Sequence, residues 1–116
     1  MLPRVRLSFI HLPGFVSECD RLGLGDEAIA ELEWQIMERP ESGKVLRGTG
    51  GLRKIRFAPG SWQRGKSGAI RVLYVYFVRA ELVYFVTAFA KNEKGNISKA
   101  EANAYKALLS RLEKSL

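Results

Sequence analysis

The feature that most constrains the fold is a pair of long apolar runs, Ala69–Arg79 and Leu82–Ala90, separated only by the short turn Ala80-Glu81. Apolar side chains occupy alternate and intervening positions in both runs, so each would be apolar on both faces of a strand. Such strands usually lie in the centre of a sheet. A third alternating run, Leu52–Ala58, precedes them. The sequence therefore predicts a meander of three antiparallel strands.

Positive charge is concentrated in the same segment. Between Gly50 and Lys94 the chain has two acids, Glu81 and Glu93, and nine basic residues: Arg53, Lys54, Arg56, Arg64, Lys66, Arg71, Arg79, Lys91 and Lys94. The net charge of this segment equals the formal charge of +7 of the whole 116-residue chain, so the remaining residues balance. Such a concentration favours a polyanionic partner, most often nucleic acid. No basic amphipathic helix is evident that would bind an anionic membrane surface.

The strand pattern predicts which of these cations meet. Lys54 and Arg56 share one face of their strand, opposite Ile55 and Phe57. Arg71 begins the next strand, and Lys91 follows the last one. Because adjacent antiparallel strands run in opposite directions, we expect Arg71 and Lys91 at the same end of the sheet, with Arg56 as a candidate neighbour.

The rest of the chain predicts one strand and two main helices around this meander. Val5–Leu12 alternates as a first strand, and a helix from about Asp26, its expected N-cap, to Arg39 has an apolar stripe that includes Leu32 and Ile36. Ser98-x-x-Glu101 is a capping box that opens the last helix. We therefore expect a single domain over residues 1–116, of the α+β class, with an antiparallel sheet and helices packed on one side.

Cysteine and histidine content excludes several kinds of site. Cys19 and His11 are the only residues of their types, so the sequence predicts neither an internal disulfide nor a zinc site, and no metal or other cofactor. We expect Cys19 to be a small buried hydrophobe and His11 a strand-end residue. The N-terminus lacks the pattern of a signal peptide and no run is long enough to span a membrane, which predicts a cytoplasmic protein.

Three stretches together carry a family resemblance: Gly48–Arg56, Gly65–Tyr76 and Ala90–Lys94, the last followed by the helix that opens on Ser98. In this order and spacing the chain resembles the RelE/HigB-like toxins of type II toxin–antitoxin pairs, nearest to the HigB branch. The resemblance covers the C-terminal two-thirds of the chain. It implies a small domain like that of compact microbial ribonucleases, and an endoribonuclease that cuts translated mRNA in the ribosomal A site. It also implies a cognate antitoxin, usually a helix-turn-helix protein.

The resemblance also implies roles for individual residues. Lys54 is the candidate base or charge-stabilising group, Arg56 and Arg71 would hold the phosphate, and Lys91 is a further candidate cation. Five further residues of the segment are candidates for contacts with mRNA or ribosomal RNA: Arg53, Arg64, Lys66, Asn92 and Lys94.

Two departures from the family pattern leave alternatives open. Some members have an arginine where this chain has Asn92, and some have a functional tyrosine or histidine near Ser98. Cleavage would then use cations alone, or a strand tyrosine such as Tyr74 or Tyr84. A toxin of the same fold without nuclease activity, which inhibits a protein such as DNA gyrase as the ParE relatives do, is one alternative. An inactive RNA-binding relative is the other.

Overall fold

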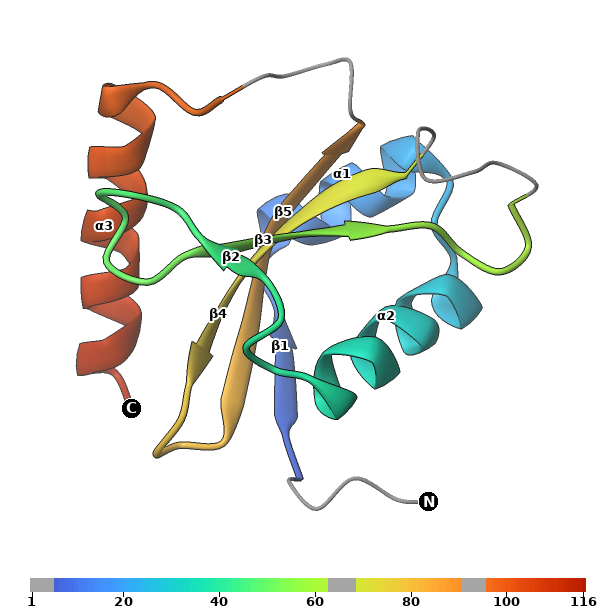
Figure 1. The fold of residues 1–116 in the computed structure, drawn as a ribbon, viewed down its shortest axis with the longest axis horizontal. Coiled ribbons are helices and arrows are strands. Elements are labelled where there is room, and N and C mark those ends of the chain that lie inside the picture. Colours follow the sequence, from blue (N-terminus) through green and yellow to red (C-terminus); the bar gives the residue numbers. More distant parts are fainter. Residues whose placement is uncertain (1–5, 63–68, 91–95) are drawn as a thin grey trace.

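The computed structural model describes residues 6–62, 69–90 and 96–116 as three helices around a five-stranded sheet (Figure 1). The helices are α1 (Pro13–Leu22), α2 (Asp26–Glu38) and α3 (Lys99–Lys114). The strands are β1 (Ser8–His11), β2 (Lys44–Val45), β3 (Arg53–Phe57), β4 (Ile70–Phe77) and β5 (Leu82–Ala90). The α+β class is as predicted. None of the helices in the described part of the chain is long and apolar enough to cross a membrane.

The strands are arranged in the order β1-β5-β4-β3-β2. β3, β4 and β5 form the predicted antiparallel meander, with β4 at its centre. The sheet is not antiparallel throughout, because β1 pairs with β5 in parallel. This part of the prediction was wrong for a physical reason. Alternation identifies a strand, but it does not identify the neighbour of a strand whose partner lies some seventy residues later.

The helices cover both faces of the sheet, which corrects the expectation that they pack on one side. Phe15 of α1 and Leu32 of α2 pack with Val72 and Phe85 on one face, which we call the α1/α2 face. Leu109 of α3 packs on the opposite face, the α3 face, where the buried residues of the sheet are Leu52, Leu73, Val75, Tyr84, Val86 and Phe89. Because β4 and β5 are apolar on both faces, one helical layer alone would leave half of their surface exposed to water.

A β-bulge in β5 changes which side chains point to each face. Leu73 of β4 pairs with Thr87 and the next residue, Tyr74, pairs with Phe85, so Val86 is an extra residue in the ladder. Strict alternation from Phe85 would place Phe89 on the α1/α2 face. The bulge moves Phe89 to the α3 face instead, where it packs in the same cluster as Val86.

The ends of the helices follow from local sequence. α3 begins with the predicted capping box: Glu101 N donates to Ser98 Oγ over 3.1 Å, and Ser98 N donates to Glu101 Oε1 over 3.0 Å. In α2 the N-cap is Gly25, so Asp26 is the first helical residue and not the cap that we expected. Asp26 and Glu27 still place negative charge at the positive end of the helix dipole.

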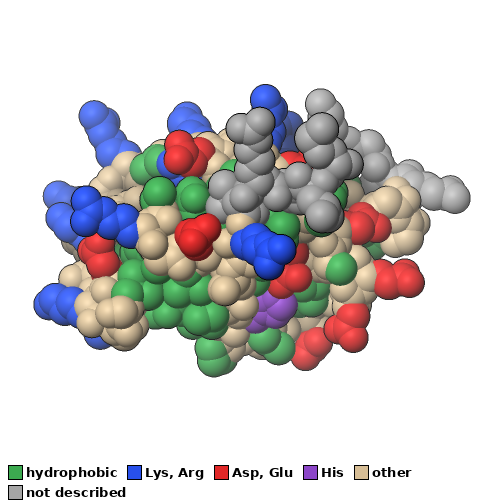
Figure 2. Space-filling model, turned by 90° about the horizontal axis from the view of Figure 1, so that it is seen from below, with side chains coloured by type: hydrophobic (Ala, Val, Ile, Leu, Met, Phe, Trp, Pro, Cys, Tyr) green, Lys and Arg blue, Asp and Glu red, His purple; other side chains and the backbone are tan. Residues whose placement is uncertain are grey.

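Charge is unevenly distributed over the surface. Between Glu18 and Glu41 the chain has eight acidic residues and two basic ones. In the face of the molecule shown in Figure 2, most acidic side chains gather toward the end occupied by α2, whereas many of the Lys and Arg side chains lie toward the end occupied by α3. The helices of the α1/α2 face therefore carry the negative charge that offsets part of the basic meander.

Candidate functional site

Three of the predicted site residues lie together on the α3 face of the sheet. Arg56 of β3 is directly opposite Arg71 of β4, and Lys54 is opposite Leu73. Residues directly opposite each other in a ladder share a face, and Leu73 belongs to the cluster covered by α3. The structure therefore confirms the expectation that Arg56 is a neighbour of Arg71. In Figure 1, β3 ends and β4 begins on the side away from α3.

A fourth cation, which sequence reasoning missed, joins this group. Lys44 of β2 is directly opposite Lys54. Its position depends on the register of a two-residue strand, and no pattern in the sequence marks that register. We refer to Lys44, Lys54, Arg56 and Arg71 as the cation cluster.

The turn between β2 and β3 sets this register. Leu46 N donates to Leu52 O over 2.8 Å. The buried hydroxyl of Thr49 donates to Leu46 O over 2.7 Å and accepts from Leu52 N over 3.0 Å. Gly48 and Gly50 flank Thr49 with φ of 77°, a left-handed conformation that other residues adopt only at a cost. These two glycines therefore serve to place β2, and with it Lys44, beside β3.

The cation cluster has no acidic partners within the described part of the chain. Arg56 is exposed and Lys54 and Arg71 are half-buried, yet no described carboxylate lies within 4.0 Å of any of them; the ion pairs found there are His11–Glu33 and Arg21–Glu18. Arg71 Nη1 donates to Ala69 O over 3.2 Å, which leaves its other N–H groups available. Like charges directly opposite in a ladder are destabilising. The cluster therefore costs stability, and it provides unpaired donors for an anion.

A groove runs along the cation cluster. Its volume is about 670 Å³, and its lining consists of all four cations together with Gln35 of α2, Ser42 and Ile55. Because β2 contains only residues 44 and 45, it leaves the later residues of β3 without a strand neighbour on that side. The groove is thus bounded by the α2–β2 connection and the basic edge of β3, a shape suited to a phosphate backbone.

Arg53 lies apart from the cluster. It shares the face of Ile55, as expected from alternation, and its Nη1 donates to Glu41 O over 2.9 Å and to Gly43 O over 2.7 Å. These bonds hold the α2–β2 connection in place, so Arg53 supports one wall of the groove. Its contact with RNA stays a prediction. The other predicted positions, Arg64, Lys66, Lys91, Asn92 and Lys94, lie outside the described residues.

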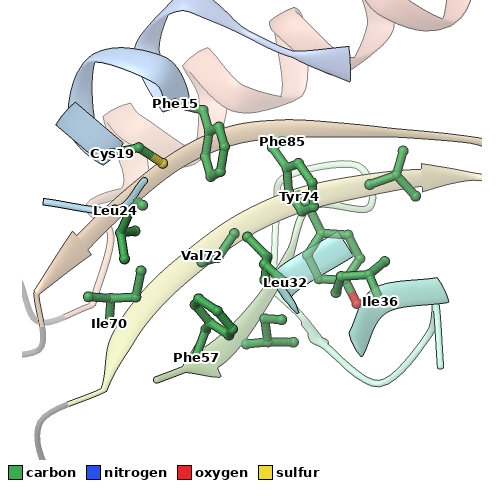
Figure 3. Packing of buried hydrophobic residues seen from close by; sticks show 13 residues of the cluster. Phe15, Cys19, Leu24, Leu32, Ile36, Phe57, Ile70, Val72, Tyr74 and Phe85 are labelled. Atoms are coloured by element: carbon green, nitrogen blue, oxygen red, sulfur yellow. The ribbon is translucent and has the colours of Figure 1, made fainter. Parts of the chain in front are cut away.

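Both strand tyrosines considered for catalysis are buried side chains. Tyr74 is 0% exposed and points into the α1/α2 cluster beside Ile36 (Figure 3). Its hydroxyl donates to Pro40 O over 2.8 Å and accepts from Gly43 N over 2.9 Å, and burial raises its pKa. Tyr84 is 8% exposed and packs edge-on against Phe77. Tyr74 is therefore a structural residue, because its hydroxyl is bonded to two backbone groups. A catalytic role for Tyr84 stays a prediction.

The two residues that we assigned structural roles behave accordingly. His11 ends β1, where its Nε2 lies 2.7 Å from Glu33 Oε2 and its ring packs against Phe15 and Phe85. Cys19 is 1% exposed, and burial, together with Asp20 and Glu18, raises the pKa of its thiol from 9.0 to about 11. A thiol with such a pKa is a poor nucleophile at neutral pH. Within the described residues no group of three or more His, Cys, Asp or Glu is placed to hold a metal ion.

Comparison with known proteins agrees with this architecture. Two solved structures of the Escherichia coli RelE toxin have the same fold. A mutant of that toxin in the free state, in which two arginines are replaced by alanine, matches with a TM-score of 0.51 and 17% sequence identity, over 89% of this chain and 96% of that one. The isolated toxin in its P21 crystal form matches with a TM-score of 0.51 and 18% identity, over 89% and 99%.

A family model gives the more specific result. The model described as the RelE toxin of the RelE/RelB toxin–antitoxin system matches residues 27–115, which include α2 from its second residue, the whole meander and α3. Toxins of such systems have a cognate antitoxin as partner. The chain therefore belongs to the RelE toxin family of toxin–antitoxin systems.

Proposed function

We propose that the chain is a ribosome-dependent mRNA endoribonuclease of the HigB-like branch. The observation that carries this proposal is the cation cluster: four basic side chains line one groove at the edge of β3, without acidic partners in the described structure. A phosphate in the groove would satisfy these donors, and Arg side chains offer it paired N–H groups. A toxin that inhibits gyrase by protein contact would not need such a convergent site.

The proposed reaction needs neither a metal ion nor a water nucleophile. The 2′-hydroxyl oxygen attacks the adjacent phosphorus, so that an O2′–P bond forms and the P–O5′ bond breaks. The 2′-hydroxyl loses a proton and the leaving 5′-oxygen gains one, giving a 2′,3′-cyclic phosphate and a 5′-hydroxyl end. Negative charge grows on the phosphate oxygens, where Arg56 and Arg71 stabilise it. Lys54 acts at the 2′-hydroxyl, as base or as charge-stabilising group.

The proposal extends to partners and setting. Lys91 would be a further cation of the catalytic site. Five other residues would contact mRNA or ribosomal RNA in the cytoplasm: Arg53, Arg64, Lys66, Asn92 and Lys94. A helix-turn-helix antitoxin would bind the toxin and silence it. We also propose that residues 1–116 act as one domain, because the groove needs elements from both halves of the chain.

Primer extension after induced expression tests this function. The toxin would be expressed beside a translated reporter mRNA and beside a copy that lacks its start codon. We expect cuts in the translated copy alone, and loss of about a hundredfold or more in cutting with Lys54→Ala, Arg56→Ala or Arg71→Ala, with circular dichroism unchanged. The matched control is Arg79→Ala, an exposed cation beyond the other end of β4. Growth arrest without cuts would contradict the proposal and point to a protein target.

Lys54→Arg separates the two roles proposed for Lys54. Arginine keeps the positive charge but is protonated at all relevant pH values, so it cannot accept the proton of the 2′-hydroxyl. If Lys54 acts as base, Lys54→Arg will lose as much activity as Lys54→Ala. If it stabilises charge, Lys54→Arg will retain most of the activity that Lys54→Ala loses.

A further inference from the structure

A second, smaller cavity adjoins the cation cluster on the α3 face. Its volume is about 210 Å³. Its apolar lining consists of Leu73 and Phe89, both buried, which we call its floor, and of Leu46 and Ile97. The cavity is below the usual size range of sites for drug-sized ligands, which begins at about 300 Å³. It therefore suits one small, flat, apolar group.

The rim of this cavity is polar and basic. Lys54, Arg47 and Asn96 line it, and Lys54 also lines the larger groove that contains Arg56 and Arg71. A group bound on the apolar floor is thus adjacent, through Lys54, to the position proposed for the phosphate. An apolar floor next to a cationic groove matches the chemistry of a nucleotide, whose base stacks while its phosphate pairs with cations.

The bulge in β5 directs the side chain of Phe89 into the lining of this cavity. Without the extra residue Val86, Phe89 would point toward the α1/α2 face and the cavity would lose its aromatic surface. A bulge interrupts ladder hydrogen bonds, and bulges often re-aim a side chain next to a functional site. Here the re-aimed side chain lines the cavity beside the predicted site residue Lys54.

We propose that this cavity binds the base of a nucleotide next to the scissile phosphate, and that Asn96 determines which base is preferred. The proposal rests on the ribonuclease function proposed above and identifies its specificity subsite. Phe89 offers an aromatic surface to the base, and the side-chain amide of Asn96, exposed at the rim, offers one donor group and one acceptor to the base edge.

Nucleotide titrations followed by NMR test the cavity without any cleavage. The intact wild-type chain would be titrated with each of the four nucleoside 3′-monophosphates and, separately, with ribose 5-phosphate, which has no base. We expect the nucleotides to shift the methyl resonances of Leu46, Leu73 and Ile97 and the ring resonances of Phe89. Ribose 5-phosphate should shift only signals near Arg56 and Arg71. If all five compounds give the same resonance shifts, and none of these shifts belongs to a cavity residue, the proposal is overturned.

Two variants test how the cavity reads the base. Ile97→Phe, which adds bulk to a half-buried wall, should weaken the binding of nucleotides about tenfold and leave that of ribose 5-phosphate unchanged. Asn96→Ala should reduce the difference in affinity among the four nucleotides by roughly tenfold. Asn103→Ala, at an exposed position of α3 that does not line the cavity, is the matched control and should change neither. Unaltered base preference in Asn96→Ala would overturn the assignment of Asn96.

The outcome for the cavity is separable from the outcome for the enzyme. If the wild-type chain cuts translated mRNA but nucleotides leave the cavity resonances unshifted, the base subsite is wrong and the ribonuclease proposal stands. If nucleotides shift those resonances and no mRNA is cut, the cavity is a nucleotide site and the reaction is wrong. If both hold, mapping of cut positions with Asn96→Ala should show a relaxed base preference beside the scissile bond.

Discussion

The α1/α2 face and the α3 face of the same sheet differ in how their polar groups are used. On the α1/α2 face, Phe15, Leu32 and Ile36 are 0% exposed, and the hydroxyl of Tyr74 forms hydrogen bonds with two backbone groups. Arg53, on the same face, bonds to two backbone carbonyls. On the α3 face, helix α3 covers one part of the sheet, and the cation cluster lies along a groove beyond it.

This difference indicates that the α1/α2 face mainly stabilises the fold, whereas the cation cluster is available to bind a ligand. The α1/α2 face satisfies its polar groups internally and excludes water, so its residues contribute to the free energy of folding. The cation cluster places like charges opposite each other, and apart from one bond of Arg71 to Ala69 O its donors have no partner among the described residues. Such an arrangement costs stability, and the phosphate that we propose for the groove would offset that cost. Substitutions on the two faces should therefore change different measurable quantities.

Leu32→Ala should have the largest effect. Leu32 is fully buried between α2 and the sheet, so its truncation should lower the free energy of unfolding by about 2–5 kcal/mol. Urea denaturation measures this change. The cleavage rate per folded molecule should stay the same. Glu38→Ala, at an exposed position of the same helix, should change stability by less than about 0.5 kcal/mol. If Leu32→Ala also strongly lowers the cleavage rate per folded molecule, the two faces do not have separate roles in stability and cleavage.

Arg71→Ala should show the opposite pattern. Its rate should fall about a hundredfold, equivalent to about 2.7 kcal/mol of transition-state stabilisation. Its free energy of unfolding should stay equal or rise slightly, because Arg56 no longer faces a like charge. Thermal denaturation monitored by circular dichroism gives the second quantity. Loss of stability with an unchanged rate would instead make Arg71 a structural residue.

Alkaline pH should destabilise the α1/α2 face through Cys19. Because burial raises its folded-state pKa above the ordinary value of 9.0, to about 11, folding favours the neutral thiol. The resulting stability is fully present below pH 9 and is lost as the pH rises through 11, by about 2–3 kcal/mol in all. Tyr74, whose pKa is also raised, adds to this loss above its own ordinary value of 10.0.

A urea titration series from about pH 8 to about pH 11.5 measures this loss of stability. Cys19→Ala should be less stable than wild type at the lower pH, because it leaves a small cavity, and its free energy of unfolding should fall less steeply as the pH rises. Parallel curves for the two proteins would show that Cys19 titrates alike in the folded and unfolded states.

The smallest effect expected is at the start of α3. Ser98→Ala removes a hydroxyl that accepts from Glu101 N, and should cost about 1 kcal/mol. Ser110→Ala, within the same helix at an exposed position, is the matched control and should cost less than about 0.5 kcal/mol. Thermal denaturation distinguishes them. Equal stability in the two variants would mean that the capping box does not hold the end of α3.

Much of the fold was predictable because it depends on local patterns and short connections. β4 and β5 are joined by a tight turn, so their antiparallel pairing, and the end of the sheet at which Arg71 lies, follow from the order of the strands. β3 pairs with β4 as expected, which places Arg56 opposite Arg71. The capping box at Ser98 involves residues three apart and was equally visible in the sequence.

Other parts of the site depend on contacts between distant segments. Lys44 reaches Lys54 only through the register of β2, and the parallel pairing of β1 with β5 joins the two ends of the fold. The burial of Tyr74 depends on Pro40 and Gly43, more than thirty residues away. No local pattern encodes such pairings, because many partners of similar hydrophobicity would satisfy the same strand.

Residue types and their spacing were sufficient to establish an α+β chain with a basic central meander, and to identify three of the four members of the cation cluster. Only packing decided that α3 covers the face opposite α1 and α2, because the apolar side chains on both faces of β4 and β5 must be buried. Packing also decided where Phe89 points. Strict alternation along β5 would place its side chain on the α1/α2 face, but the extra residue Val86 places it on the α3 face, where it lines the cavity beside Lys54.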